Sequence, residues 1–289
     1  AERLDIDINV INSWESGDSQ PTLKQLDKLA TTLKRPIAVF FLPEAPKELP
    51  IPKDYRILPS NIGEFDKETI MAIRKARRLQ KTSMELLENQ NEPVYPRVNH
   101  VTLNSNPFEI ALKIRSEFGI TEDLQKRWKN AYDAFNYIRE KIEANNIFVF
   151  QMQMPIEDAR GFVLADSNPF VIVVNSSDNI SARIFTLLHE YGHVLLKESG
   201  VDNPDCSIDN QQYAVERWCN DLASEFLLPS DILKKEIATR EADLMDFETN
   251  ERFITKMKVS KSMFYYKLYL KNYIDNRAFN EVMEILRRG

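Results

Sequence analysis

The most constraining feature of this chain is an apolar stretch, beginning near residue 181, that holds two histidines and a glutamate. His189 and His193 lie four residues apart, and Glu190 directly follows the first. Their apolar neighbours predict a helix that is buried on most of its sides: Ile184, Phe185, Leu187, Leu188, Val194, Leu195 and Leu196. Burying two imidazoles and a carboxylate without partners costs several kcal/mol, so a compensating cation is expected.

The spacing of these three residues is the HExxH pattern. Residues four apart share one helix face, so both imidazoles can reach one metal ion. We expect His189 and His193 to bind Zn²⁺, with Mn²⁺ as the alternative metal. Glu190 points to another side of the helix, where it can hold a metal-bound water without being a ligand. Glu190 is therefore the predicted catalytic residue, taking a proton from water and delivering it to the leaving amine.

A catalytic zinc site needs a third protein ligand, for which the sequence offers two glutamates. Glu216 is the preferred candidate, because Asn220 follows it by one helical turn and could orient a ligating histidine. This spacing repeats, with Asn for Asp, the ExxxD arrangement of the thermolysin-like zinc peptidases. Glu225 is the rival, on the same predicted helix but about two and a half turns further along. Cys206 and Cys219 are better interpreted as non-ligands.

Peptide hydrolysis also calls for a hydrogen-bond donor to the tetrahedral oxyanion. The candidates are Tyr213, Arg183, Tyr265 and Tyr266, among which the sequence does not choose. An extended substrate needs a surface as well. The β-rich run 170–174 is either an open sheet edge that could pair with a substrate or an internal strand.

Periodicity predicts an α+β fold that is mainly helical and zincin-like, with a small and mostly antiparallel sheet. The expected strands span residues 147–152, 161–165 and 170–174. The expected helices span residues 8–15, 23–33, 65–89, 107–118, 130–145 and 212–227, together with the helix beginning near Ser181. The predicted division is a partial all-α helix-turn-helix (1–42), a Pro-rich linker (43–60), a metallopeptidase domain (61–250) and a basic helical tail (251–289).

From residue 54 onward the chain resembles the ImmA/IrrE family of metallopeptidases. The shared pieces are Asp54-Tyr55-Arg56, Arg160-Gly161-Phe162, and residues 169–175, 184–193 and 216–229. Tyr191 and Cys219 depart from the family, in which Leu and Ala are common there. The resemblance implies that His189, His193 and Glu216 bind zinc and that Glu190 is catalytic. It also implies a protein substrate, an XRE-type helix-turn-helix repressor whose cleavage derepresses stress or mobile-element genes.

The first 42 residues resemble an XRE-type helix-turn-helix from its second helix onward. Residues 1–4 would end that helix, residues 8–15 would be the recognition helix, and residues 14–23 carry the usual close of the motif. Asn9, Asn12 and Ser13 are the candidate DNA contacts. No Lys or Arg lies between Leu4 and Leu23, whereas DNA-binding segments normally neutralise phosphates with basic side chains. A structural or protein-docking role is the alternative.

Residues 251–289 are basic and predict a second helix-turn-helix-like unit, with Ser260 as a helix cap. DNA contact is one interpretation, and a packing subdomain that completes the cleft is the favoured one. The whole chain has a net charge of −6, which does not favour extensive nucleic-acid binding. With two cysteines and no apolar run long enough to span a bilayer, the sequence indicates a cytoplasmic protein without a membrane partner. It does not determine the oligomeric state, and a dimer is compatible with it.

Two functions therefore follow from the sequence. The first is a zinc-dependent endopeptidase that cleaves a repressor. The second is a DNA-binding transcriptional regulator whose metal domain is a sensor or binding platform with little turnover. Replacing Glu190 by Gln separates them, because it should abolish cleavage in the first case and leave regulation intact in the second.

Overall fold

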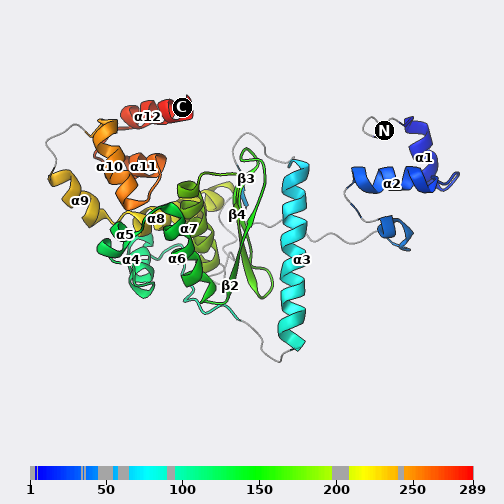
Figure 1. The fold of residues 1–289 in the computed structure, drawn as a ribbon, viewed down its shortest axis with the longest axis horizontal. Helices are drawn as coiled ribbons and strands as arrows, with labels where there is room; N and C mark the ends of the chain where they lie inside the picture. The colour runs from blue at the N-terminus through cyan, green and yellow to red at the C-terminus, as the bar shows by residue number, and fades with distance from the viewer. Residues whose placement is uncertain are drawn as a thin grey trace. The chain divides into compact units, whose positions relative to one another are not determined.

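The computed structural model describes residues 4, 6–33, 35, 37–44, 55–57, 65–89, 95–196, 208–239 and 244–288. The chain forms two compact units, Ala1–Ile51 and Pro52–Gly289. Figure 1 shows the helices and strands of each unit.

The N-terminal unit is all-helical, as predicted. It contains α1 (Ile8–Ser16), α2 (Leu23–Thr32) and the 3-10 helix η2 (Ile37–Phe41). Gly17 ends α1 with a φ of 83°, a left-handed conformation that glycine adopts without steric cost. Thr22 begins α2 through a capping box with Gln25, in which each side chain binds the other residue's backbone N–H. The helix end expected at residues 1–4 lies largely outside the described residues.

The second unit is built on a mixed sheet of β1 (Tyr55–Ile57), β2 (Ile147–Met152), β3 (Ala159–Leu164) and β4 (Phe170–Asn175). The strand order is β1-β3-β4-β2. Strand β3 is antiparallel to both β1 and β4, whereas β2 is parallel to β4. Two of these three pairings are antiparallel, so the predicted small, mostly antiparallel sheet is confirmed.

Two features of this sheet differ from expectation. The open-edge interpretation of residues 170–174 is wrong, because β4 is paired with a strand on each side and is therefore internal. Every residue of β4 is buried, as expected for a strand covered on both faces. Strand β1 lies within the predicted Pro-rich linker, where three residues are too few to give a recognisable alternation.

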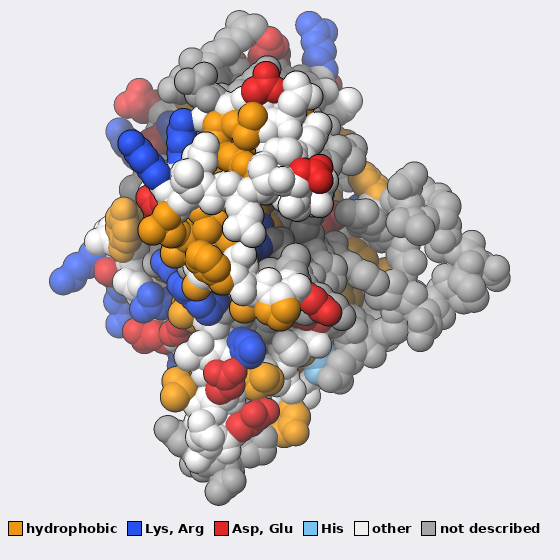
Figure 2. Space-filling model, turned by 90° about the vertical axis from the view of Figure 1, so that its right-hand side faces the viewer, with side chains coloured by type: hydrophobic (Ala, Val, Ile, Leu, Met, Phe, Trp, Pro, Cys, Tyr) orange, Lys and Arg blue, Asp and Glu red, His pale blue; other side chains and the backbone are white. Residues whose placement is uncertain are grey.

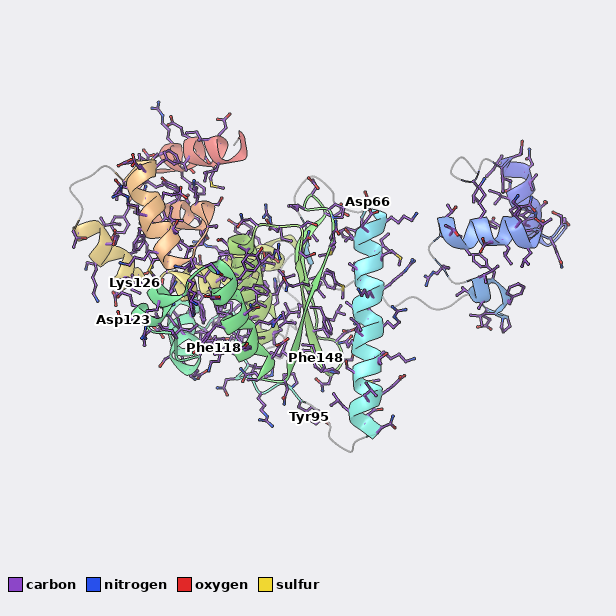
Figure 3. All side chains as sticks on the ribbon, in the orientation of Figure 1. Asp66, Tyr95, Phe118, Asp123, Lys126 and Phe148 are labelled. Carbon is purple, nitrogen blue, oxygen red and sulfur yellow. The ribbon has the colours of Figure 1, made fainter. Side chains whose placement is uncertain are left out.

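Helices cover both faces of the sheet (Figure 1). The long helix α3 (Lys67–Asn89) lies alone on one face, where Ala72, Ile73 and Ala76 pack against strand residues such as Phe162 and Val173. Phe148 of β2 belongs to this layer, between the sheet and α3 (Figure 3). On the opposite face, α6 (Ala131–Glu143) and α7 (Ile180–Leu196) pack against the strands. Helix α8 (Ile208–Leu227) packs on α7, and α4 (Pro107–Glu117) packs on α8.

Polar contacts at two levels fix α3 to the sheet. Buried Asp158, in the β2–β3 connection, accepts hydrogen bonds from the backbone N–H of Asp66 and the hydroxyl of Thr69, both at 2.6 Å. Figure 3 labels Asp66 at the start of α3. Further along the helix, the Gln80 amide donates to the backbone oxygens of Ser167 and Pro169, both at 2.9 Å. These bonds satisfy buried polar groups and set the position of α3 along the β3–β4 hairpin.

The predicted helical tail is present. Two short helices, α5 (Glu122–Arg127) and α9 (Ser230–Ala238), precede α10 (Phe247–Met257), α11 (Lys261–Leu270) and α12 (Asn276–Arg288). Ser260 caps α11 as expected, its hydroxyl accepting from the Met263 N–H at 3.2 Å. The sequence did not predict α5 and α9, which have six and nine residues and show little periodicity. Within the described residues, no helix combines the length and apolar character needed to cross a bilayer.

Candidate metal centre

The HExxH segment lies on α7, which begins directly after a capping turn. The Asn179 side chain accepts the backbone N–H of Ser181 at 2.9 Å, which satisfies one of the free donors at the helix start. From Thr186 to Leu196 every residue of α7 is buried, including His189, Glu190 and His193. The burial inferred from the apolar flanks is therefore observed.

The backbones of α7 and α8 come unusually close beside the histidines. A Cβ added to Gly192 would lie 3.0 Å from Cys219 Sγ and 3.3 Å from Cys219 Cα. A side chain at residue 192 would therefore require Cys219 and the α8 backbone to shift by a few tenths of an ångström. Burial raises the pKa of the Cys219 thiol, so the neutral side chain fills space as a small hydrophobic residue does. Cys206 lies outside the described residues.

The close approach brings three donor groups together. His189 Nε2 lies 3.1 Å from His193 Nε2 and 3.1 Å from Glu216 Oε2. His193 Nε2 lies 3.3 Å from Glu216 Oε1. Tetrahedral zinc with metal–ligand bonds of about 2.0–2.1 Å separates its ligand atoms by about 3.3–3.4 Å. Glu216 reaches the two histidines through different oxygens, and the three donor groups lie close enough together to hold a single ion.

Asn220 occupies the position expected for it, one turn after Glu216. Its Oδ1 lies 3.0 Å from His189 Nδ1. With the proton on Nδ1 donated to this oxygen, Nε2 keeps the lone pair that faces the other two donors. The arrangement fixes both the ring orientation and the tautomer of His189.

Glu190 is fully buried on the side of α7 that faces the sheet. A Cβ added to Gly161 of β3 would lie 3.3 Å from Glu190 Cγ, 2.5 Å from Thr186 Cγ2 and 2.8 Å from the Val173 carbonyl oxygen. Only glycine lets α7 pack this closely on β3. The sequence pointed to Gly161 solely through the family resemblance, and nothing in its local pattern indicated contact with Glu190.

The electrostatics of the site favour a charged carboxylate at Glu216. Burial raises the pKa of Glu216, but hydrogen bonds and charge attraction from His189 and His193 outweigh it and hold the pKa far below its ordinary value. An anionic Glu216 is the charge state that a divalent cation requires of a carboxylate ligand.

Glu225 is not brought to the histidines. Its Oε2 accepts from the Ser230 hydroxyl at 2.6 Å and pairs with the Lys267 ammonium, while Oε1 accepts the Ser230 N–H at 2.8 Å. Lys271 lies 3.9 Å from the same carboxylate. Of the two rivals for the third ligand, the geometry places Glu216 in the cluster and Glu225 against the tail.

The four candidate oxyanion donors occupy different environments. Tyr265 is buried in the tail, where its hydroxyl accepts from the Asn250 amide at 2.9 Å. The Tyr266 hydroxyl donates to Asp221 on α8 at 3.2 Å, one residue beyond Asn220. Arg183 donates to the Asp178 carbonyl near the start of α7. Tyr213, one turn before Glu216, is 70% exposed. Tyr213 and Tyr266 thus lie on or against α8, the helix that carries Glu216.

Two family models match parts of the chain. Residues 142–269 match the IrrE N-terminal-like domain, a peptidase family, over a range that contains β2 to β4 and helices α7 and α8. Residues 1–40 match the helix-turn-helix family. The peptidase-type domain thus follows a helix-turn-helix segment, in the order that the resemblance implied. No curated protein matches the chain.

The candidate DNA contacts of the helix-turn-helix segment lie on α1. Asn9 and Asn12 are exposed. Ser13 is partly buried, and its hydroxyl donates to the Val10 carbonyl at 2.8 Å and lies 2.6 Å from the Ser19 hydroxyl. The face of the molecule in Figure 2 shows basic, acidic and hydrophobic side chains interspersed. Asn9 and Asn12 are therefore better placed than Ser13 to contact an external partner.

Proposed function

We propose that this protein is a zinc-dependent endopeptidase whose IrrE N-terminal-like domain binds the metal through His189, His193 and Glu216. The observation that carries the proposal is the convergence of their donor groups, with one ligand atom from each residue within 4.8 Å of the others, as binding of a single ion requires. Mn²⁺ is the alternative metal. The family match supports the peptidase class of the domain.

Each residue has a distinct task in the proposed reaction. When bound, Zn²⁺ supplies Lewis acidity that polarises the scissile carbonyl and acidifies a water. Glu190 takes the water proton and passes it to the leaving amine. Asn220 keeps His189 in the tautomer that presents Nε2 to the site. Tyr213, which is exposed on α8 one turn before Glu216, is the proposed donor to the oxyanion. The Tyr266 hydroxyl donates to Asp221 and would have to give up that bond to take this role.

The proposed substrate is a helix-turn-helix transcriptional repressor, whose cleavage would switch on stress or mobile-element genes in the cytoplasm. This step rests on the resemblance to the ImmA/IrrE family. A second candidate, a DNA-binding regulator with little turnover, is favoured by the helix-turn-helix match at residues 1–40.

The deciding experiment incubates the zinc-loaded protein with the repressor encoded nearest its gene, with and without a chelator. We expect cleavage that the chelator abolishes. Glu190→Gln should end cleavage and retain metal, measured by mass spectrometry of the metal content. Absence of cleavage with zinc or manganese at any protein ratio would remove the peptidase proposal, provided that the metal is bound.

DNA binding is tested separately, by mobility shift on the DNA upstream of its own gene. If residues 1–42 read DNA, Asn9→Ala with Asn12→Ala weakens the shift while Glu190→Gln does not. If residues 251–289 bind it, exposed Lys256→Ala has the larger effect. No shift with the wild-type chain would favour a structural or protein-docking role for the first 42 residues.

A further inference from the structure

The outer edge of β3 is occupied by a three-residue strand from another part of the chain. Strand β1 pairs with β3 antiparallel, with Tyr55 opposite Phe162 and Ile57 opposite Ala159. The other edge of β3 pairs with β4. Strand β1 therefore fills the position in which an external peptide would add to this side of the sheet.

This edge lies beside the proposed catalytic residue. Glu190 packs over Gly161, which lies in β3 between the two residues that β1 opposes. Neighbouring strands are about 4.8 Å apart, so the backbone of β1 runs one strand spacing from the residue beneath Glu190. An extended chain in the place of β1 would thus pass close to the reacting groups.

The pairing of β1 has the features of an exchangeable strand. Its residues 55 and 57 are two apart, whereas their partners 162 and 159 are three apart, so β3 carries an extra residue within the pairing. A bulge of this kind leaves a residue unpaired and interrupts the ladder. Strand β1 has three residues and β3 has six. A longer peptide could form more backbone hydrogen bonds with β3 than β1 does.

We propose that β1 occupies, in cis, the edge of β3 that an extended peptide substrate uses, so that the substrate binds only when β1 leaves. The inference rests on the proposed peptidase function and adds its regulation. Strand β1 begins soon after the boundary between Ile51 and Pro52. Strand β1 is thus the first strand or helix of the second unit along the chain.

The test measures binding of a fluorescein-labelled synthetic peptide of residues 52–60 to the full chain carrying Glu190→Gln, which prevents cleavage of the probe. N–H groups of successive strand residues point to opposite edges. Replacing both Tyr55 and Arg56 by proline therefore removes a donor to β3 whichever residue supplies it. If β1 covers the edge in about nine-tenths of the parent molecules, only about one-tenth can bind the probe. We therefore expect the probe to bind this variant about tenfold more tightly than the parent.

The matched control places two prolines, Lys47→Pro and Glu48→Pro, in a stretch that already contains four. It should bind the probe as the parent does. Hydrogen–deuterium exchange supplies a second readout, because amides of residues 159–164 should exchange faster in the β1 variant and regain protection with the probe. Equal binding to parent and β1 variant, or no binding to a folded β1 variant, would overturn the proposal.

A disulfide between β1 and β3 tests the opposite state, in which β1 cannot leave the edge. Ile57 and Ala159 are direct partners, and opposite residues in antiparallel strands lie about 4.5–5.5 Å apart, within reach of a disulfide. In a chain carrying Ile57→Cys, Ala159→Cys and Cys206→Ser, oxidation should abolish probe binding and reduction should restore it. Chains that carry only one of the two introduced cysteines should not respond. Binding that survives the disulfide contradicts the proposal.

These binding experiments do not depend on turnover. If the wild-type chain cleaves nothing while the probe follows the predicted order, the peptidase function fails and the cis occupancy stands. If cleavage is observed and the probe binds the parent and the β1 variant equally, the peptidase function stands and the cis occupancy by β1 fails.

Discussion

Two glutamates on the same helix, Glu216 and Glu225, differ in what they face. Glu216 meets the imidazoles of His189 and His193 and is about a quarter exposed, with 27% of its side chain accessible. Glu225 is 3% exposed and meets Lys267 and Ser230. One carboxylate can accept a metal in place of protons, while the other is already neutralised by a fixed cation. The partners, more than the helix position, decide the role of each carboxylate.

The two carboxylates are also expected to contribute to different free energies, one to folding and the other to metal binding. The pair formed by Glu225 and Lys267 joins α8 to α11 within one buried core, so its loss is expected to appear in folding stability. The cluster around Glu216 is expected to appear in metal affinity, because its donors converge on a single point. Substitutions at the two positions should therefore affect different measurements.

The largest expected effect is on stability, from Glu225→Gln. Removing this carboxylate leaves the Lys267 ammonium buried without its counter-charge, which costs about 3–5 kcal/mol of unfolding free energy. Urea denaturation measures it. The double variant Glu225→Gln with Lys267→Met is the control and should recover most of the loss, since both charges are then gone. A loss below about 1 kcal/mol in the single variant would show that water reaches the pair.

Next in size is the effect of Glu216→Gln on metal binding. The amide keeps the shape of the carboxylate but removes the charge that binds a cation. Zinc affinity, measured by competition with a chromophoric chelator, should fall at least about 100-fold, beyond the 10–100-fold typical of outer partners. Glu225→Gln should leave the affinity unchanged. The distinction between the carboxylates fails if both variants lose zinc equally.

Asn220→Ala is expected to have a smaller effect on the same measurement. Without Asn220, the His189 ring loses the acceptor that fixes its tautomer, and zinc affinity should fall about 10–100-fold. Ser230→Ala is the corresponding change beside Glu225, and it should lower stability by about 1 kcal/mol with no effect on zinc. An unaltered zinc affinity in Asn220→Ala would argue against this positioning role.

The smallest expected effect is a pH dependence at the Glu225 end of α8. Burial lowers the pKa of Lys267 to about 8 from an ordinary value of 10.5, against the opposing influence of Glu225. Between these values the unfolded chain binds more protons than the folded one, so unfolding free energy should rise with pH. Denaturation at about pH 8 and about pH 10 checks this, with the double variant subtracted as reference. If the unfolding free energy relative to the double variant falls between about pH 8 and about pH 10, the pKa of Lys267 is not lowered by folding.

The sequence predicted those parts of the fold that leave a local hydrophobic pattern in the chain. The β-rich runs gave β2, β3 and β4 to within a residue or two, and the apolar flanks gave a buried α7. Strand β1 was missed because its formation depends on the distant β3 edge. For the same reason β4 could not be recognised as internal, since strand order is a tertiary property.

The site shows the same limit. HExxH spacing placed His189 and His193 together, because four residues on a helix fix their separation. Helix geometry alone left Glu216 and Glu225 as rivals, since the choice depends on contacts with α7 and α11. The contact between Gly161 and Glu190 likewise joins a strand and a helix that are distant in sequence.

The buried Lys267 has a practical consequence for dissecting this protein. A fragment that ends at residue 250, before α11, would retain the Glu225 carboxylate and lose its cation. That unpaired charge would lie on the helix that presents Glu216, so an inactive fragment would say little about the chemistry of the intact chain. The region that matches the peptidase family must therefore be expressed together with α11 before its proposed activity is tested.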